Sequence, residues 1–292
     1  MPEFTQVIVA GLSQGAIYAL LGLGFSIVFL ATRILNLAQG SFALWGGFVF
    51  LSMVAGAKIP LAISFVIMLI LSAALGALTQ LIVSLRSKPW RPISPDMAVL
   101  STLALLVFFE GAAFMIWGPD PQRGPALENG VFRLFGAIVP WQLVWMIVGA
   151  LIIATGLQVF LRSTWSGRAM RACAQNPMMS SLLGINVRRI GVLAFALGAM
   201  IGATAGILVS PITWLDYQSG GTFALNGILA YLIGGEEDVA GPVVGGFLLG
   251  IVQSALLLLP GTSGGLLEQV VPMLALIIML VFRPQGLLAR RI

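Results

Sequence analysis

The sequence predicts an all-α polytopic membrane protein with about eight or nine transmembrane helices. Residues of the set AVILMFWYC make up 59% of the 292-residue chain, whereas Asp, Glu, Lys and Arg together make up 9%. A soluble domain carries roughly 25% charged residues. Several nearly charge-free stretches reach the roughly 20 residues that a helix needs to cross a hydrocarbon core of about 30 Å. Short alternating segments typical of an outer-membrane barrel are not found, so helices are the expected spanning elements.

Nine apolar segments divide the chain, and one or two of them are short or broken. We expect them at about 7–30, 36–55, 60–85, 97–117, 139–161, 190–211, 223–235, 239–259 and 266–282. The first residues, Met1-Pro2-Glu3, lack the basic flank of a signal peptide, so we expect the first span to be retained.

The basic residues assign a side of the membrane to each loop. Twelve of the 15 Lys and Arg residues follow odd-numbered segments: Arg33, Arg86, Lys88, Arg91, Arg162, Arg168, Arg171, Arg188, Arg189, Arg283, Arg290 and Arg291. The other three are Lys58, Arg123 and Arg133. Under the positive-inside rule the N-terminus is periplasmic, the C-terminus is cytoplasmic, and residues 118–138 form a periplasmic excursion. The expected location is the bacterial inner membrane.

Composition also excludes several function classes. The net charge of +5 is compatible with nucleic-acid binding, but the basic residues lie between apolar spans, where the positive-inside rule explains them, so no nucleic-acid partner is expected. Cys173 is the only cysteine and there is no histidine, which excludes disulfides, Cys- or His-based metal sites and Ser–His catalysis. No GxxxxGK[ST] phosphate-binding loop occurs. We therefore expect a protein that is not an enzyme and holds neither a cofactor nor a metal ion.

Two irregular stretches interrupt the helical pattern. Residues 36–41 open the second segment, and the segment 223–235 is too short to span comfortably. Broken or short helices at related places in two halves indicate an inverted-repeat transporter. The stretches share a loose pattern: Ser41-Phe42-Ala43-Leu44 before Gly46-Gly47, and Thr222-Phe223-Ala224-Leu225 before Gly234-Gly235. Small residues that recur only for close helix packing are the alternative explanation.

Polar side chains inside the apolar spans are candidates for a solute path, because they are unfavourable in lipid. Asn and Gln there also serve as simple interhelical hydrogen-bonding groups. Glu110, the only acid inside a long span, either faces a water-filled cavity or is protonated and structural. Asn36 and Gln39 adjoin a helix break, where free backbone N–H and C=O groups can pair with a zwitterion or an amide. The candidate path residues are Gln14, Asn36, Gln39, Gly40, Ser41, Glu110 and Asn226.

A short helix is predicted inside the loop 162–189. Asn176 can cap it, Pro177 suits its first position and Gly184 suits the residue after its end, so we expect a helix of about two turns over 177–183. Its apolar surface is formed by Met178, Met179, Leu182 and Leu183. A cytoplasmic loop has no reason to expose such a surface. These residues either pack back onto the bundle or bilayer, or dock a partner subunit.

This loop resembles the coupling loop of ABC importer permeases, in the version of the high-affinity branched-chain amino acid family. The matching residues are Gly167-Arg168-Ala169-Met170-Arg171-Ala172, Asn176-Pro177 and Leu182-Leu183-Gly184-Ile185-Asn186. Further similarity covers 11–24, Asn36-Leu37-Ala38-Gln39-Gly40, 101–110 with Trp117-Gly118-Pro119-Asp120, Gly234-Gly235 with 241–246, and 282–287. The resemblance implies one ABC importer transmembrane domain over 1–292, with ATPase contacts at Gly167, Arg168, Arg171, Asn176, Pro177, Met178, Leu182, Leu183 and Gly184.

The resemblance also implies a function: the chain would be a permease subunit of an ATP-driven importer for branched-chain amino acids or related small polar solutes, and it would work by alternating access. The implied partners are ATP-binding cassette subunits, an identical or homologous second permease, a periplasmic solute-binding protein and membrane lipid. Gln39 stands where the family has His, Glu110 where Gln is usual, and Glu236-Glu237-Asp238 where residues are small and neutral. These departures leave the solute open, and amides or urea are alternatives.

Functions of other classes are less well supported by the residues. A secondary transporter or channel independent of ATPases is expected to carry ion-coupling acids on facing helices, and Glu110 has no obvious intramembrane partner in the sequence. An intramembrane hydrolase needs a serine–histidine or paired-aspartate centre, and the sequence has neither histidine nor a pair of intramembrane aspartates.

The predicted topology has a direct test by chemical labelling. A cysteine introduced at Gln122 should react with a membrane-impermeant thiol reagent from the periplasm, and one introduced at Gln175 should not. The reverse pattern would overturn the topology and, with it, the assignment of 162–189 as a coupling loop.

Overall fold

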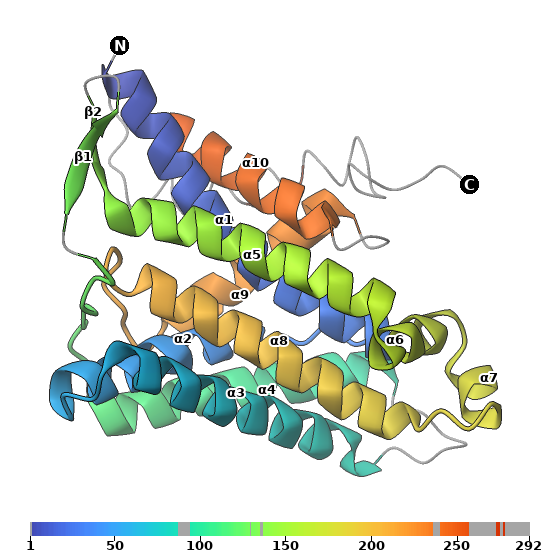
Figure 1. The fold of residues 1–292 in the computed structure, drawn as a ribbon. Coiled ribbons are helices and arrows are strands. Elements are labelled where there is room, and N and C mark those ends of the chain that lie inside the picture. The colour runs from blue at the N-terminus through green and yellow to red at the C-terminus, as the bar shows by residue number, and fades with distance from the viewer. Residues whose placement is uncertain are drawn as a thin grey trace.

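The computed structural model is a bundle of long apolar helices (Figure 1). It describes residues 2–86, 94–128, 130–134, 137–235 and 240–256, with positions 273, 274 and 277. Several predicted features lie outside the described residues: Lys88, Arg91, Glu236, Glu237, Asp238, most of the ninth segment, the motif at 282–287, Arg283, Arg290 and Arg291.

Within the described ranges, six helices are long and apolar enough to cross a membrane. They are α1 (Pro2–Thr32), α2 (Gln39–Leu51) with its π-helical continuation η1 (Ser52–Gly56), α3 (Leu61–Val83), α4 (Pro95–Trp117), α5 (Trp141–Ser163) and α8 (Val187–Val209). Two shorter helices follow, α9 (Ser219–Gly234) and α10 (Ala240–Leu256). These helices lie within five residues of the first eight predicted segments, which confirms a helical polytopic membrane protein with a short seventh segment.

The remaining described elements are short. They are the 3-10 turn η2 (Ser84–Arg86), the strands β1 (Val131–Leu134) and β2 (Ala137–Pro140), and the helices α6 (Trp165–Gln175) and α7 (Pro177–Leu182). The strands form an antiparallel hairpin in which Phe132 pairs with Val139. Neither the hairpin nor α6 was predicted. Figure 1 shows the hairpin at one end of the bundle and α6 and α7 at the other; these are called the hairpin end and the α7 end below.

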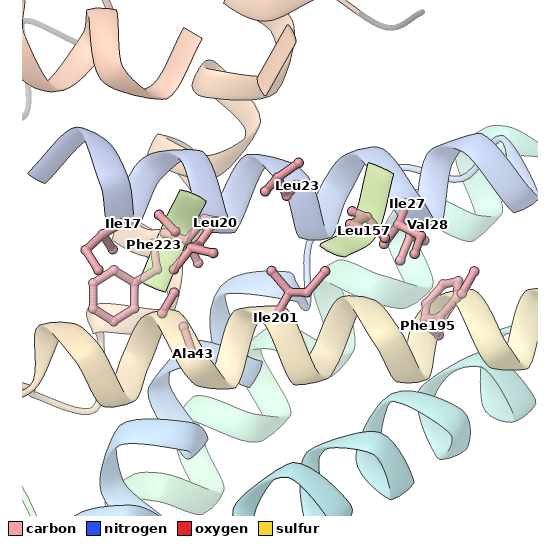
Figure 2. Packing of buried hydrophobic residues seen from close by; sticks show 14 of the residues in the cluster. Ile17, Leu20, Leu23, Ile27, Val28, Ala43, Leu157, Phe195, Ile201 and Phe223 are labelled. Atoms are coloured by element: carbon pink, nitrogen blue, oxygen red, sulfur yellow. The ribbon is translucent and has the colours of Figure 1, made fainter. Parts of the chain in front are cut away.

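Helices α1 and α8 form the centre of the bundle. The apolar window of α1 is 83% buried and that of α8 is 72% buried, against 17–22% for α3, α4 and α5. Figure 2 shows side chains of α1, among them Leu23 and Ile27, in a layer with Ile201 and Phe195 of α8. Helices α3, α4 and α5 consequently turn large apolar side chains outward, such as Met115 and Ile152.

Glycines allow α10 to approach α1 at backbone distance. A Cβ atom added to Gly250 would overlap the backbone of Gly11 and Gly15, and one added to Gly15 would lie 2.7 Å from the Cα atom of Phe247. Lipid chains are as apolar as Leu side chains, so helices in a membrane associate through such close packing rather than through the hydrophobic effect. The glycine spacing on these two helices is therefore a packing feature.

The connection before α9 is fastened to the loop that follows α4. Gln122 and Leu215 exchange two backbone hydrogen bonds of 2.8 Å, and Arg123 donates through Nε to the Pro211 carbonyl at 2.6 Å. Both loops lie on the same side of the bundle, opposite Arg33, which contacts α6. The structure therefore separates the basic residues of the 118–138 loop from Arg33 and the basic loop 162–189, as the sequence pattern predicts.

Candidate substrate path and coupling loop

The break between α1 and α2 exposes backbone groups inside the bundle. Helix α1 ends at Thr32, residues 33–38 are not helical, and α2 begins at Gln39 without a side-chain cap at Ala38. The first turn of a helix has N–H groups with no partner within the helix. The Gln39 N–H donates to the Asn36 carbonyl at 3.0 Å, which closes a turn at the start of α2. The predicted irregular stretch 36–41 is non-helical only at 36–38, because residues 39–41 already belong to α2, and the break extends back to Arg33 instead.

Thr102 of α4 holds the broken segment in place. Its hydroxyl oxygen accepts a hydrogen bond from the Leu37 N–H at 3.2 Å and lies 3.3 Å from the Leu35 carbonyl, to which it can donate. A single side chain of a neighbouring helix thus satisfies two groups of non-helical backbone. Sequence reasoning missed Thr102, because a lone threonine in an apolar helix carries no distinguishing pattern.

Three polar side chains at this break are fully buried and incompletely paired. Asn36, Gln39 and Ser41 are each 0% exposed. Neither amide atom of Asn36 has a hydrogen-bond partner, and the same holds for Gln39 Oε1 and Ser41 Oγ. A buried polar atom without a partner costs about 1–3 kcal/mol, and buried groups are nearly always paired in native proteins. Such a concentration at a helix break makes these residues candidates for a functional role.

Gln39 also joins three helices. Its Nε2 donates to the Gly198 carbonyl of α8 at 2.7 Å. A Cβ atom added to Gly24 of α1 would overlap the same amide, and one added to Gly202 would lie 2.9 Å from Nε2. The amide therefore fits between α1 and α8 only because glycines face it. Its role as a path residue remains a prediction, and its described contacts are interhelical.

Helices α2 and α9 begin next to each other. A Cβ atom added to Gly40 would overlap the Gly220 carbonyl and lie 2.5 Å from the Ala224 nitrogen. The structure therefore brings together the two irregular stretches that the sequence analysis paired. Before α9, a turn resembles the one before α2: the Ser219 N–H donates to the Asp216 carbonyl at 3.2 Å.

Acidic side chains occupy the start of α9. Glu110 of α4 accepts a hydrogen bond from the Gly221 N–H at 2.7 Å through Oε1. Asp216 Oδ1 accepts from the Ser219 hydroxyl at 2.8 Å and from the Gln218 N–H at 3.0 Å. The positive end of a helix dipole favours negative charge at this position. Glu110 is half-buried, and its hydrogen bond with Gly221 joins α4 to α9. This contact is compatible with both predicted roles, a carboxyl that faces a water-filled cavity and a protonated structural one.

The other two candidate path residues lie farther along the helices. Gln14 donates to the Tyr18 hydroxyl at 3.0 Å, and that hydroxyl donates to Gln253 Oε1 of α10 at 2.6 Å. Gln14 precedes Gly24 by ten residues, roughly 15 Å along a helix axis. Asn226 is buried on α9, six residues beyond Gly220, roughly 9 Å along the axis. The structure groups Asn36, Gln39, Gly40, Ser41 and Glu110, and it does not bring Gln14 to them.

The helix predicted in the loop 162–189 is present as α7. It begins at Pro177, Asn176 Oδ1 accepts from the Met179 N–H at 3.0 Å, and Gly184 has a left-handed φ of 82°. It ends at Leu182, one residue earlier than predicted. These observations confirm the capping residues, because each performs the local role that its chemistry favours.

Helix α6 packs against the end of α5, and α7 packs against α6 and α8. Thr164 Oγ1 caps α6 by accepting from the Gly167 N–H at 3.0 Å. A Cβ atom at Gly167 would overlap the Phe160 carbonyl, so only glycine permits this approach. Cys173 is fully buried between α6 and α7, and burial raises the pKa of its thiol, an effect that a hydrogen bond with Ser180 partly offsets. The single thiol is therefore shielded and poorly ionised at neutral pH.

The apolar residues of the α7 segment do not pack back onto the bundle. Their exposed fractions are 74% for Met178, 58% for Met179, 73% for Leu182 and 81% for Leu183. Arg168 and Arg171 are exposed as well. A contiguous exposed apolar surface rimmed by charges is typical of a protein–protein contact.

Comparison with known proteins gives one family. The model of the family described as branched-chain amino acid transport system / permease component matches residues 7–282. The high-affinity branched-chain amino acid transport system permease protein BraD of Pseudomonas aeruginosa is 28% identical and covers 99% of this chain and 98% of its own length. The corresponding permease protein LivH of Escherichia coli K12 is 27% identical, with coverage of 98% and 96%.

Two further likenesses extend the comparison. The ribose import permease protein RbsC of Escherichia coli K12 is 27% identical over 86% of this chain and 78% of its own length. A chain of the structure described as PsaBC from Streptococcus pneumoniae in complex with Fab aligns with a TM-score of 0.51 at 13% identity, covering 97% of this chain and 93% of that one. At this identity the structural likeness concerns the fold alone.

The contact between Glu110 and Gly221 predicts the behaviour of two Glu110 variants. Glu110→Gln keeps an oxygen that accepts from the Gly221 N–H, so the variant should assemble and transport normally, with at most a changed solute preference. Glu110→Leu leaves that N–H unpaired, and we expect about 1–3 kcal/mol of destabilisation. Thermal unfolding in detergent, together with uptake of radiolabelled leucine by cells, measures both effects.

Thermal unfolding and leucine uptake of the variant Gln39→Leu test the side chain at the start of α2 in the same way. If Glu110→Leu and Gln39→Leu both transported like the parent chain, neither side chain would line the path.

Proposed function

This chain belongs to the family of branched-chain amino acid transport system permease components, and from that premise we propose that it is the transmembrane permease subunit of an ATP-driven importer for branched-chain amino acids. The relatives are permease proteins and not enzymes. The observation that carries the proposal is the exposed apolar surface of α7, held by α6 at the end of the bundle where the basic loops gather. That surface fits a separate ATPase, which this chain needs because it has no phosphate-binding loop of its own.

The solute path in this proposal passes the start of α2. The unpaired groups of Asn36, Gln39 and Ser41 are donors and acceptors of the kind that an α-carboxylate and an α-ammonium group require. Free amide groups at a broken helix serve zwitterions in this way. The same groups also suit an amide or urea, which therefore remain alternative solutes. High affinity would reside mainly in a periplasmic solute-binding protein.

Internal symmetry supports alternating access around this path. Helix α1 packs against α8, α9 and α10, while α8 packs against α1, α2 and α3. This reciprocal order fits an inverted repeat in which α1–α3 correspond to α8–α10. The similar turns before α2 and α9 fit the same relation. We propose eight or nine spans in all, with the ninth over 266–282, and rocking of the two halves about the contact between α2 and α9.

The proposed partners and location follow from the surfaces. ATP-binding cassette subunits would bind α7 and its neighbours in the cytoplasm. A second permease, identical or homologous, and membrane lipid would share the outward apolar faces of α3, α4 and α5. The periplasmic binding protein would approach the hairpin end. In this proposal the N-terminus is periplasmic and the C-terminus is cytoplasmic, in a bacterial inner membrane.

Uptake by cells tests the substrate class. Cells from which the gene of this chain is deleted should take up radiolabelled leucine, isoleucine or valine more slowly, with recovery when the gene is restored. Unchanged amino acid uptake with slowed uptake of an amide or urea would shift the substrate within the same family. Transport that persists after removal of the ATPase subunit would favour an ATPase-independent transporter or channel instead.

Docking of the ATPase on α7 predicts a sharp effect of one substitution. Leu182→Asp places a charge in the centre of the exposed apolar surface and should detach the ATPase, with a loss of several kcal/mol if Leu182 is a central anchor. The matched control is Leu85→Asp, because Leu85 is 72% exposed on η2 and Leu182 is 73% exposed on α7. Both variants should insert and fold, since both residues lie outside the membrane-spanning helices that the structure describes, Leu85 being beyond the end of α3 at Val83.

Co-purification of the ATPase with the parent chain, Leu182→Asp and Leu85→Asp measures the docking, and solute-stimulated ATP hydrolysis measures the coupling. Undiminished co-purification and coupling in Leu182→Asp would show that α7 is not the docking element.

A further inference from the structure

Arg33 has an unusual backbone conformation at the point where α1 breaks. Its φ angle is 57°, in the left-handed region, and it shares this property with only one other non-glycine residue, Lys58, among the residues that the structure describes. Glycine is the residue that adopts this conformation without strain. An arginine at such a position indicates that the side chain is needed there.

The guanidinium group of Arg33 binds the end of α6. Its Nε and Nη2 atoms both donate to the Ala174 carbonyl, at 3.2 and 2.9 Å. Helix α6 ends at Gln175, so its last carbonyls lack partners within the helix. A positive charge at this end also complements the helix dipole. This contact joins Arg33, the residue directly after α1, to α6, the helix that precedes α7.

The same guanidinium group reaches α9 through aromatic rings. Its central carbon lies 5.4 Å from the centroid of the Phe29 ring, and that ring lies 5.7 Å from the ring of Tyr231 on α9. A cation over an aromatic face within about 6 Å is attracted to it. Tyr231 is fully buried, so this chain of contacts enters the core of the bundle.

Arg33 is also close in sequence to the polar cluster at the start of α2. Only Ile34 and Leu35 separate Arg33 from Asn36, and the Asn36 carbonyl accepts the backbone hydrogen bond that begins α2. Displacement of α6 would therefore act on the start of α2 through the backbone, and on the C-terminal end of α9 through Phe29 and Tyr231. Among the described residues of the segment 33–38, Arg33 is the only one whose side chain has a hydrogen bond to α6.

We propose that Arg33 is the positioning residue that transmits movement of the α6–α7 unit to the start of α2 and to the C-terminal end of α9, where Tyr231 lies. This inference rests on the proposed function, in which α7 receives the ATPase. Chains of packed side chains and hydrogen bonds carry coupling between separate sites when the element they join has two arrangements. Arg33 joins the unit that the ATPase would move to both broken helices that would enclose the path.

The test compares Arg33→Gly with Lys58→Gly. Glycine relaxes the left-handed backbone at both positions, so neither change adds strain, and each removes one exposed cation. Only Arg33→Gly removes the contact with Ala174. The permease is captured with its ATPase from native membranes, ATP hydrolysis is measured in the complex, and uptake of radiolabelled leucine is measured in the same cells.

In Arg33→Gly we expect undiminished capture of the ATPase and a fall of about three- to thirtyfold in leucine uptake per ATP hydrolysed. Lys58→Gly should keep the parent ratio, and Arg33→Lys, which retains the charge but not the forked donor geometry, should fall between. A parent ratio in Arg33→Gly would overturn this inference alone. Loss of ATPase capture in Arg33→Gly would also overturn this inference, because it would show that Arg33 is needed for the structure of the docking site. A parent complex that captures no ATPase would overturn the proposed function and this inference with it.

Discussion

A helix that stops inside a bilayer leaves backbone N–H and C=O groups where no water can satisfy them, and each must find a partner within the protein. Much of the arrangement around α2 and α9 follows from this constraint. Thr102 serves the carbonyl and N–H groups of the segment between α1 and α2, while Glu110 and Asp216 serve the start of α9. Asn36, Gln39 and Ser41 retain unpaired atoms after these needs are met, and in the proposed mechanism these atoms bind the transported solute.

The breaks depend on close backbone approach. Gly40 meets Gly220 at the starts of the two helices, and Gly24 leaves room for the Gln39 amide. Side chains larger than hydrogen would separate the helices and remove the contact between the two halves. In the proposed mechanism this contact is the point about which the halves rock, while α1 and α8 supply the rigid buried centre. In the same mechanism the movement enters at the C-terminal end of α1, where Arg33 contacts α6.

Local chemistry explains which parts were predictable from the sequence. Apolar length located the spans, and the capping residues Asn176, Pro177 and Gly184 located α7, because these signals act within a few residues. The hairpin was missed, since strands of four residues give little periodicity. The contact from Arg33 to Ala174 joins residues 141 positions apart, and the pairing of Tyr18 with Gln253 joins residues 235 positions apart. Such tertiary contacts leave no mark in a single sequence. Asp216 was also missed, because it lies two residues before Gln218, the N-cap of α9, and so does not stand at a capping position.

The proposed mechanism requires that the start of α2 contacts the transported solute. Its most direct test is the accessibility of a cysteine at position 41, since the Ser41 side chain is fully buried and the native Cys173 is buried as well. In transport-competent cells, Ser41→Cys should react with a membrane-permeant thiol reagent while the parent chain does not. Saturating leucine should slow that reaction. Labelling of Ser41→Cys at the same rate with and without leucine, or its complete failure to react during transport, would contradict the claim.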